Sequence, residues 1–306
     1  MRWLDHRDPV PDPLRGAIIA LGNFDGFHLG HQAVAGEAVR WAREQGRPAI
    51  VATFDPHPVR FFKPDVPPFR LTTLEQRQEL YLAAGAAAML VFHFDAALAE
   101  TSADDFVRTI LRDRLGAHGV VTGEDFTYGK GAAGNVAHLR TFGERLAVRT
   151  VGAVMDGGAP VSSSRIRTAL REGNPQEAAR LLTRPFAVRG IVEHGDKRGR
   201  TIGYPTANLS LESYLRPAYG IYAVTGRILA TGEVLRGAAN IGVRPQFEPP
   251  KELLEPYFFD FSGDLYGQEI EVAFHHFLRG EARFDTLEAL TAQMERDCAE
   301  ARAFLA

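Results

Sequence analysis

Residues 22–31 read GNFDGFHLGH and directly follow an apolar run at residues 17–21 that has the composition of a buried strand. The amphipathic segment at residues 30–45 then predicts a helix. A strand, a glycine-rich turn and a helix are therefore expected in that order, with both histidines of the turn at the carboxyl end of a parallel strand. Open α/β sheets bind their ligands at this edge.

The rest of the N-terminal half repeats this alternation. Apolar runs at residues 49–54, 89–94 and 120–122 predict further strands, and the segments at residues 74–84 and 102–115 predict helices between them. Strands that alternate with helices are typical of parallel βαβ units. We therefore expect a Rossmann-like, doubly wound parallel sheet.

The chain changes character near residues 184–185. Short β-type runs punctuated by Gly and Pro follow, for example at residues 220–225 and 270–277, and they predict an antiparallel β-barrel. In residues 286–305, Leu287, Leu290, Met294 and Ala301 recur at helical spacing and predict a closing helix. The expected fold class is α/β plus β, with domains at residues 1–183 and 184–306.

Composition narrows the class of partner. The formal net charge of the 306 residues is −3, with both signs mixed along the chain, so no basic surface for nucleic acid or membrane is indicated. Cys298 is the only cysteine, which excludes an internal disulfide. No segment has the length and apolarity of a signal peptide or membrane span. We expect a cytoplasmic protein that acts on small molecules, and its sequence is compatible with self-association without requiring it.

The turn at residues 22–31 has the chemistry of a phosphate site. Its glycines let the backbone approach a ligand closely, and the first amides of the following helix favour negative charge. His28 and His31 can donate hydrogen bonds to a triphosphate, whose oxygens gain charge during nucleotidyl transfer. Two alternatives are a tight turn with incidental histidines and a metal-binding histidine pair, although a nearby third ligand is lacking. The expected ATP contacts here are Gly22, Asn23, Phe24, Asp25, Gly26, His28, Gly30 and His31.

Two later segments also suit phosphate. Residues 162–167, SSSRIR, combine a hydroxyl-rich helix start with the planar fork of Arg167, although a capped helix with surface arginines would look the same. Residues 190–209 read GIVEHGDKRGRTIGYPTANL, a glycine-rich basic loop that can cradle ATP or form a solvated hairpin. After that loop, Thr206 and Asn208 place two hard oxygen ligands on one face of an extended strand, where Mg²⁺ and phosphate could bind together, unless they belong to a polar edge strand.

These motifs resemble a known family. GNFDGFHLGH resembles the HxGH nucleotidyltransferase superfamily, and in this form it is similar to the bacterial bifunctional riboflavin kinase/FMN adenylyltransferase (FAD synthetase) family. TFDPHP at residues 53–58, GEDFTYG at 123–129, SSSRIR and PTAN support the resemblance, as do ANIGVRP at 239–245, DLYG at 264–267 and LRGEARF at 278–284. The motifs occur in the family's order over about residues 16–297.

The resemblance implies two reactions. A riboflavin-kinase-like barrel would convert riboflavin to FMN with MgATP, Glu255 being the catalytic base. The N-terminal domain would join FMN to the AMP part of a second ATP, giving FAD and pyrophosphate, with His28 and His31 as its catalytic residues. In the adenylyltransferase site, the resemblance adds Ser162, Ser163, Ser164 and Arg167 to the ATP contacts of the turn, and it implies flavin contacts at Phe54, His57, Pro58, Asp125 and Phe126. In the kinase site, the implied ATP contacts are Gly195, Lys197, Arg198, Gly199, Arg200, Gly203, Pro205, Thr206 and Asn208, and Thr206 and Asn208 would also bind Mg²⁺. The implied flavin contacts of the kinase site are Arg279 and Phe284.

Four positions depart from the family pattern. Thr127 and Tyr128 stand where an Arg or Lys and a Phe are usual, Gln246 replaces the usual Thr, and Tyr257 replaces the usual His. These departures keep open an enzyme with only one of the two activities. Two further alternatives are a nucleotidyltransferase for another phosphate ester and a non-catalytic flavin-binding regulator.

Overall fold

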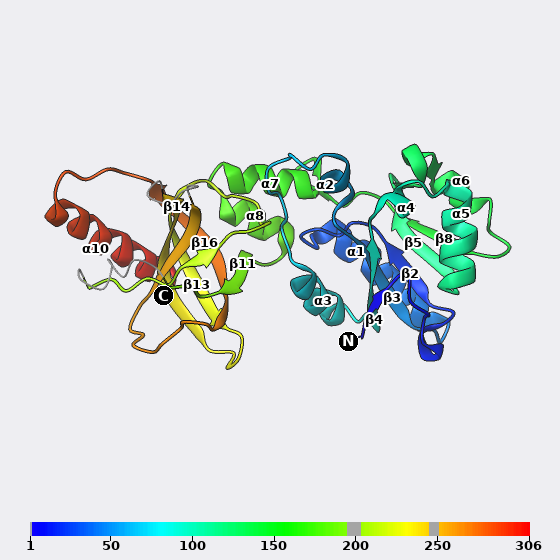
Figure 1. Ribbon diagram of the computed structural model, residues 1–306, viewed down its shortest axis with the longest axis horizontal. Helices are drawn as coiled ribbons and strands as arrows, with labels where there is room; N and C mark the ends of the chain where they lie inside the picture. The colour runs from blue at the N-terminus through cyan, green and yellow to red at the C-terminus, as the bar shows by residue number, and fades with distance from the viewer. Residues whose placement is uncertain (1, 195–202, 245–250) are drawn as a thin grey trace. The chain divides into compact units, whose positions relative to one another are not determined.

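The chain, described here from a computed structural model covering residues 2–194, 203–244 and 251–306, divides into two compact units (Figure 1). The first unit comprises Met1–Val66 and Thr73–Ser162. The second comprises Ser163–Ala306 together with the short segment Pro67–Thr72. Two helices that precede residue 184, α7 (Ser163–Arg171) and α8 (Pro175–Leu182), belong to the second unit.

The first unit is built on a parallel sheet, as the sequence predicted. Its six strands are β1 (Arg2–Asp5), β2 (Ile18–Leu21), β3 (Ala49–Asp55), β4 (Ala88–His93), β5 (Gly119–Gly123) and β8 (Ala147–Val151), in the spatial order β1-β4-β3-β2-β5-β8. From β2 the chain proceeds to β3 and β4 on one side and later returns to β5 on the other. The carboxyl end of β2 is therefore the point where the winding direction changes, which is where such sheets form their binding crevice.

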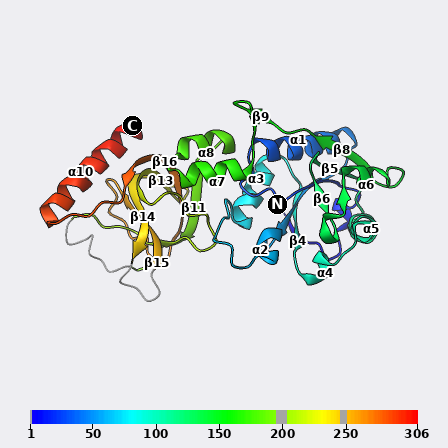
Figure 2. The same cartoon turned by 90° about the horizontal axis from the view of Figure 1, so that it is seen from above.

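Helices cover both faces of this sheet (Figure 2). On one face, α1 (Leu29–Glu44) and α3 (Leu74–Ala83) bury a cluster that includes Ile18, Val51 and Tyr81. On the other face, α5 (Ala103–Asp105) and the π-helix η2 (Phe106–Arg114) form one continuous helical segment over Phe92 and its neighbours. The remaining short elements are η1 (Asp12–Leu14), α2 (Pro58–Phe62), α4 (Ala96–Ala99), β6 (Thr127–Tyr128), η3 (Lys130–Ala132), β7 (Gly134–Asn135), α6 (Val136–Arg140), β9 (Met155–Asp156) and β10 (Ala159–Pro160).

The second unit contains the predicted antiparallel barrel. Its strands are β11 (Phe186–Ile191), β12 (Leu209–Ser210), β13 (Gly220–Ile228), β14 (Val234–Arg244), β15 (Lys251–Phe258) and β16 (Glu269–Gly280), in the order β11-β16-β13-β14-β15-β12. A bridge between Glu193 and Asn208 connects the two ends of this order, so the sheet nearly closes on itself.

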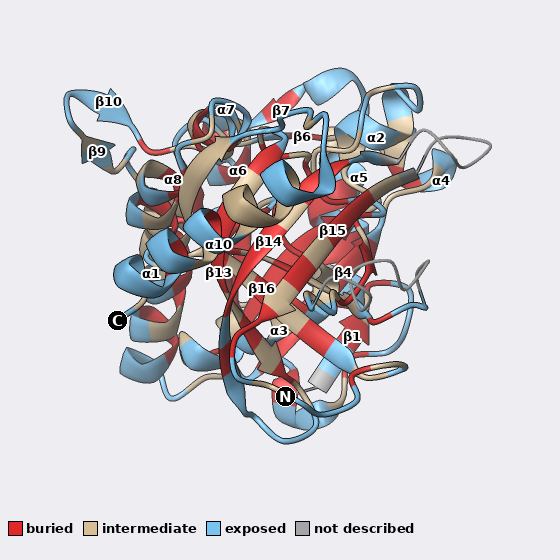
Figure 3. Cartoon of the chain, turned by 90° about the vertical axis from the view of Figure 1, so that its left-hand side faces the viewer, coloured by how far each residue is buried: buried red, intermediate tan, exposed pale blue. Residues whose placement is uncertain are grey.

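The C-terminal helix α10 (Leu287–Phe304) packs against β13, β14 and β16, as Figures 1 and 3 show. The helix itself is confirmed, but its packing face differs from the predicted apolar stripe, because Leu287 is 55% exposed whereas Asp297 is 5% exposed beside the buried Ala301. Burial raises the pKa of the Cys298 thiol to about 11, so this side chain stays protonated near neutral pH. Within the described ranges, no helix is both long and apolar enough to cross a bilayer.

Trp41 is one of the buried residues that attach helix α1 to the sheet. The indole lies so close to β5 that a Cβ added at Gly119 would come within 2.4 Å of its Cη2 atom. The guanidinium of Arg149 on β8 lies 4.4 Å from the centre of the Trp41 ring, and it also forms an ion pair with Glu37 of α1 at 2.9 Å. These contacts hold the second half of α1 against β5 and β8.

We expect Gly119→Ala to lower the free energy of unfolding of the first unit by about 1–3 kcal/mol, because the methyl group has to displace Trp41. Gly36→Ala is the matched control: a Cβ at this exposed position of α1 meets nothing within 4 Å, so alanine should stabilise the helix by up to about 1 kcal/mol. Both tryptophans, Trp3 and Trp41, belong to the first unit, so urea unfolding followed by tryptophan fluorescence reports on this unit alone. Equal stability of the two variants would contradict the packing argument.

Candidate active sites

The GNFDGFHLGH turn has an unusual backbone. Phe24 and Phe27 have positive φ angles of 47° and 45°, and Gly26 between them has a φ of 87°. Glycine adopts this conformation readily, whereas a bulky aromatic residue does so only when its surroundings compensate for the cost. Here the rings of Phe24 and Phe27 pack edge-on against each other, and both contact the ring of Tyr81 on α3. The turn is therefore held in one conformation by its own aromatic side chains.

His28 caps helix α1. Its Nδ1 atom accepts hydrogen bonds from the amides of Gly30 at 3.1 Å and His31 at 3.4 Å, which places the proton of the neutral ring on Nε2. A Cβ at Gly30 would lie 3.2 Å from the His28 ring, so glycine gives the cap its room. The ring of His31 stacks on that of His28 with centroids 3.6 Å apart. Two imidazoles and the first turn of a helix thus meet at the carboxyl edge of the sheet.

Not every predicted contact residue of the turn faces outward. Asp25 is 2% exposed, and its Oδ1 accepts a hydrogen bond from the buried Arg77 on α3 at 2.8 Å. The carbonyl oxygen of Asn23 accepts a hydrogen bond from the Thr53 hydroxyl at 2.6 Å, which joins the turn to the end of β3. Arg77 was not singled out by the sequence analysis, because a single arginine in a predicted helix is usually on its solvated side.

The TFDPHP motif lies at the same edge of the sheet, because it begins in the last residues of β3 and runs into α2. His57 caps the short helix α2, whose first residue is Pro58, and its Nδ1 accepts a hydrogen bond from the amide of Val59 at 3.2 Å. Phe54 is 7% exposed and stacks on Phe92 in the core, with ring centroids 4.9 Å apart. His57 thus lies near the surface, whereas Phe54 packs in the hydrophobic core beneath this edge of the sheet.

The GEDFTYG loop is fixed by a chain of hydrogen bonds. The Tyr128 hydroxyl lies 2.6 Å from Nδ1 of His138, and Nε2 of His138 lies 2.9 Å from Oδ1 of Asp104 on α5. Burial raises the pKa of Tyr128 to about 12, so its hydroxyl remains a donor. The ring of Phe126 stacks on Tyr128 at 5.7 Å, while Asp125 is exposed. The departure from the family at Tyr128 is therefore accompanied by a partner for its hydroxyl.

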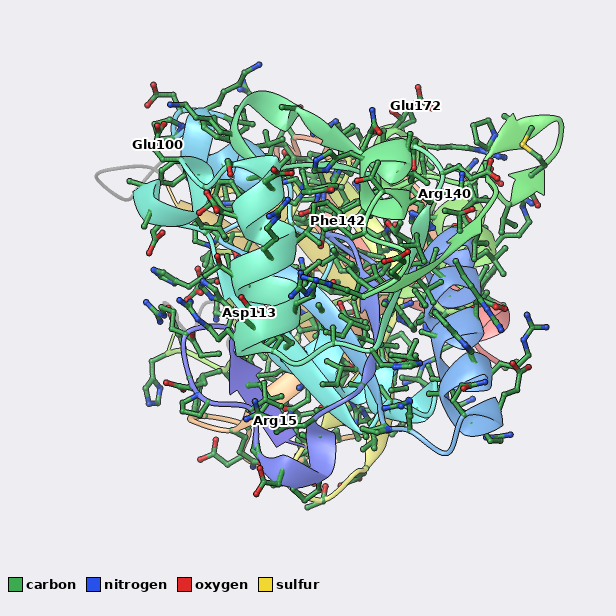
Figure 4. The ribbon with its side chains drawn as sticks, turned by 90° about the vertical axis from the view of Figure 1, so that its right-hand side faces the viewer. Arg15, Glu100, Asp113, Arg140, Phe142 and Glu172 are labelled. Atoms are coloured by element: carbon green, nitrogen blue, oxygen red, sulfur yellow. The ribbon has the colours of Figure 1, made fainter. Side chains whose placement is uncertain are left out.

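The surroundings of His138 are aromatic and basic. The ring of Phe142 meets His138 edge-on at 5.3 Å, and the guanidinium of Arg108 on η2 lies 5.5 Å from the centre of the Phe142 ring (Figure 4). The hydrogen-bonded chain consequently connects the loop to His138 of α6 and, through it, to Asp104 of α5.

The SSSRIR motif is divided between the two units. Ser162 ends the first unit, whereas Ser163, the first residue of α7, and Ser164 belong to the second. Arg167 donates from Nε to the carbonyl oxygen of Phe69 at 2.9 Å and stacks over the Phe69 ring, both within the second unit.

In the barrel, strand register brings three polar residues together. Asn240 on β14 is paired with Glu255 on β15, and its Nδ2 donates to Oε2 of Glu255 at 3.4 Å. Leu209 is paired with Leu254, and the amide of Ala207 donates to the carbonyl oxygen of Pro256 at 2.9 Å. Continuing this register places Asn208 opposite Glu255, so Asn208, Glu255 and Asn240 occupy one row on adjacent strands and share one face. The PTAN segment and the predicted base are thus neighbours.

Helix α10 lies along the same side of the barrel. Arg279 at the end of β16 forms a two-pronged ion pair with Asp297 of α10, with the shortest distance 2.6 Å, and Gln293 donates to the same carboxylate at 2.8 Å. The Arg279 guanidinium also lies 5.8 Å from the centre of the Phe284 ring. The two predicted flavin contacts, Arg279 and Phe284, are therefore next to each other.

Several predicted residues cannot be placed. Gly195, Lys197, Arg198, Gly199 and Arg200 of the basic loop, and the departure Gln246, lie outside the described residues. Gly203 and Pro205, which follow that loop, are exposed, and Thr206 is half-buried. Tyr257, another departure, packs edge-on against Tyr204 with ring centroids 5.1 Å apart.

The donor set can be compared with the needs of Mg²⁺. Across residues 2–194, 203–244 and 251–306 there is no cluster of three or more His, Cys, Asp or Glu side chains arranged for a metal. Mg²⁺ differs from zinc in this respect, because it typically takes one or two protein oxygens and completes its shell with water and substrate phosphates. The side-chain oxygen atoms of Thr206 and Asn208 fit that requirement, whereas the stacked histidines at residues 28 and 31 do not form a complete metal site.

The hydrogen-bond chain of the GEDFTYG loop can be tested with Tyr128→Phe. Loss of the hydroxyl removes a donor to half-buried His138 and should lower the free energy of unfolding of the first unit by about 1 kcal/mol. In a double-mutant cycle with His138→Ala, measured by tryptophan fluorescence in urea, the two losses should not add, because both variants break the same bond. Additive losses would show that the two side chains do not interact.

Comparisons with known proteins agree over the whole chain. Residues 10–165 match the FAD synthetase family, and residues 182–305 match the riboflavin kinase family. The bifunctional riboflavin kinase/FMN adenylyltransferase of Escherichia coli is 37% identical over 295 residues, covering 95% of this chain and 94% of that protein. The protein of the same name from Listeria monocytogenes is 40% identical over 293 residues, covering 94% and 92%.

A solved structure from Streptococcus pneumoniae is also similar, with a TM-score of 0.86 and 30% identity over 96% of this chain and 97% of that one. It is described as a macrolide-efflux protein, a description that concerns that protein alone. The two family matches cover separate parts of the chain, and both relatives match over more than nine-tenths of it. This chain belongs to the bifunctional riboflavin kinase/FMN adenylyltransferase family.

Proposed function

We propose that the chain synthesises FAD from riboflavin in two ATP-dependent steps, each carried out by one part of the molecule. As a member of this family it is a riboflavin kinase and an FMN adenylyltransferase. Residues 184–306 would carry the kinase activity and residues 1–183 the adenylyltransferase activity. The two family matches, to residues 10–165 and 182–305, support this division of function.

In the kinase step, an alcohol attacks the γ-phosphoryl group of ATP and must lose its proton. Glu255 would accept this proton from the 5′-hydroxyl of riboflavin, and the hydrogen bond from Asn240 would orient the carboxylate. Thr206 and Asn208 would hold Mg²⁺, which when bound neutralises charge on the ATP phosphates. The residues of the basic loop, together with Gly203 and Pro205, would contact those phosphates. Arg279 and Phe284 would contact the flavin beside α10.

In the adenylyl step, the phosphate of FMN attacks the α-phosphorus of ATP, and pyrophosphate leaves. The attacking oxygen is already charged, so no general base is needed, and catalysis depends on stabilising charge on the leaving group. His28 and His31 would do this together with the amides that begin α1, assisted by Ser162, Ser163, Ser164 and Arg167. His57, Pro58, Asp125 and Phe126 would contact FMN, with Phe54 supporting them from the core.

The observation that carries this assignment is the cap on α1. Nδ1 of His28 accepts hydrogen bonds from the first amides of α1, so the proton of the neutral ring is on Nε2, and the positively polarised end of this helix favours a phosphate oxygen. We further propose that the enzyme works in the cytoplasm on small molecules only, which its charge balance and single cysteine support.

His31→Ala should lower the rate of FAD formation from supplied FMN by about 10²-fold or more, because a donor to the developing charge is lost. Formation of FMN from riboflavin should be unchanged in the same preparation. His118→Ala is a suitable control, since His118 precedes β5 and so lies at the opposite edge of the sheet. Both flavins can be resolved by chromatography after incubation with MgATP. A parallel fall of both activities without unfolding would refute the separation of the sites.

Glu255→Gln should impair the kinase activity and leave the adenylyltransferase activity intact. Loss of the base should slow FMN formation by about 10²-fold or more, while FAD formation from supplied FMN continues at the normal rate. Glu233→Gln, an exposed change between β13 and β14, controls for the loss of a negative charge. Unchanged FMN formation in Glu255→Gln would exclude this carboxylate as the base.

A further inference from the structure

A buried arginine outside the recognised motifs is connected to two of them. Arg77 of α3 is 2% exposed, which is rare for a charged side chain, and it forms an ion pair with Asp25 of the GNFDGFHLGH turn at 2.8 Å. Its other terminal nitrogen, Nη1, donates to the Thr53 hydroxyl at 3.0 Å and to the carbonyl oxygen of Asn23 at 3.4 Å. Thr53 begins TFDPHP, so a single guanidinium joins both motifs.

The contacts of Arg77 span the left-handed part of the turn. Asn23 and Asp25 flank Phe24, and Phe24 and Phe27 both have positive φ. One helical turn after Arg77, Tyr81 packs against both phenylalanine rings. Helix α3 therefore holds the turn electrostatically through Arg77 and by ring packing through Tyr81. Thr73 in turn fixes the start of α3 through a reciprocal capping box with Gln76.

We infer that Arg77 is a positioning residue for FMN adenylylation, which sets the path of the turn from which His28 and His31 act. The guanidinium is buried and its neighbours are protein groups, so it acts through the turn and not on the substrate. Arginine suits this role because its planar guanidinium has two terminal nitrogens. One of them reaches the carboxylate, and the other reaches both the hydroxyl and the carbonyl oxygen. A displacement of about 1 Å in catalytic groups is enough to reduce turnover by about 10²-fold.

This inference rests on the proposed assignment of FMN adenylylation to the first unit. Its test distinguishes a failure of the inference from a failure of that proposed function. The full chain is supplied with FMN and MgATP, and FAD formation is measured. A wild-type chain that makes no FAD would contradict the proposed function. The inference concerns only the difference between the wild-type chain and its variants, and riboflavin phosphorylation by the same samples verifies that the second unit is intact.

In Arg77→Met, kcat for FAD formation should fall by about 10²-fold. The change in KM for FMN should be smaller, because Thr53, where TFDPHP begins, keeps its hydrogen bond to the carbonyl oxygen of Asn23 at 2.6 Å. Asp25 is then a buried carboxylate without its cation, so the urea midpoint of the first unit should also fall. Arg149→Met is the matched control: it removes an arginine that pairs with α1 but does not touch the turn, and FAD formation should be retained.

The double variant Asp25→Asn, Arg77→Met distinguishes positioning from stability. It removes both buried charges, so the urea midpoint should return close to that of the wild type. If Arg77 positions the turn, kcat should remain low although stability is restored. The inference is overturned if the double variant recovers kcat together with stability, or if Arg77→Met alone retains the wild-type kcat.

Discussion

The ion pair between Asp25 and Arg77 is the interaction on which the geometry of the first unit depends. A charge removed from water must be paired and hydrogen-bonded, and breaking such a pair costs about 3–5 kcal/mol. Arg77 satisfies this requirement only when the turn after β2, the end of β3 and helix α3 are all in place. The same contacts keep the turn in the conformation that presents the amides and imidazoles at the start of α1. From the other end, the packing of Trp41 on Gly119 fixes α1 on the sheet.

The two sites meet different chemical demands. A hydroxyl nucleophile needs a base, and in the barrel the row formed by Asn208, Glu255 and Asn240 contains a carboxylate between two amide side chains. A phosphate nucleophile is already charged and needs only stabilisation of the departing pyrophosphate. Correspondingly, the turn after β2 offers imidazoles and helix amides, and its one carboxylate, Asp25, is buried in the ion pair with Arg77. The distribution of acidic side chains thus matches the two reactions.

The sequence was sufficient to predict the alternating strands and helices from β2 to β5, whereas the outer strands β1 and β8 of the sheet were not predicted. The strands at residues 49–54 and 120–122 and the helices at residues 30–45 and 286–305 are confirmed within a few residues. The two strands are buried on both faces and therefore read as continuous apolar runs, whereas the helices show apolar residues at helical spacing. The family resemblance and the two-step activity are supported by the comparisons.

Interactions between distant segments were not predictable in the same way. Asp25 looked like an outward contact of the turn, since nothing local indicates that Arg77, far along the chain, lies beneath it. Similarly, Asp297 takes part in the packing of α10 because Arg279 neutralises it, while Leu287 stays exposed. Tyr128 was noted as a departure, and only the structure brings His138 to its hydroxyl. In each case the decisive partner is a polar group whose position follows from tertiary packing.

The central claim is that one chain contains both sites and uses them in succession. The most direct test is a time course in which the wild-type chain is incubated with riboflavin and MgATP while riboflavin, FMN, FAD and pyrophosphate are measured together. The account predicts that FMN appears first and is then converted to FAD, with one pyrophosphate released per FAD. Accumulation of FMN without any FAD, or FAD formation without an FMN requirement, would contradict it.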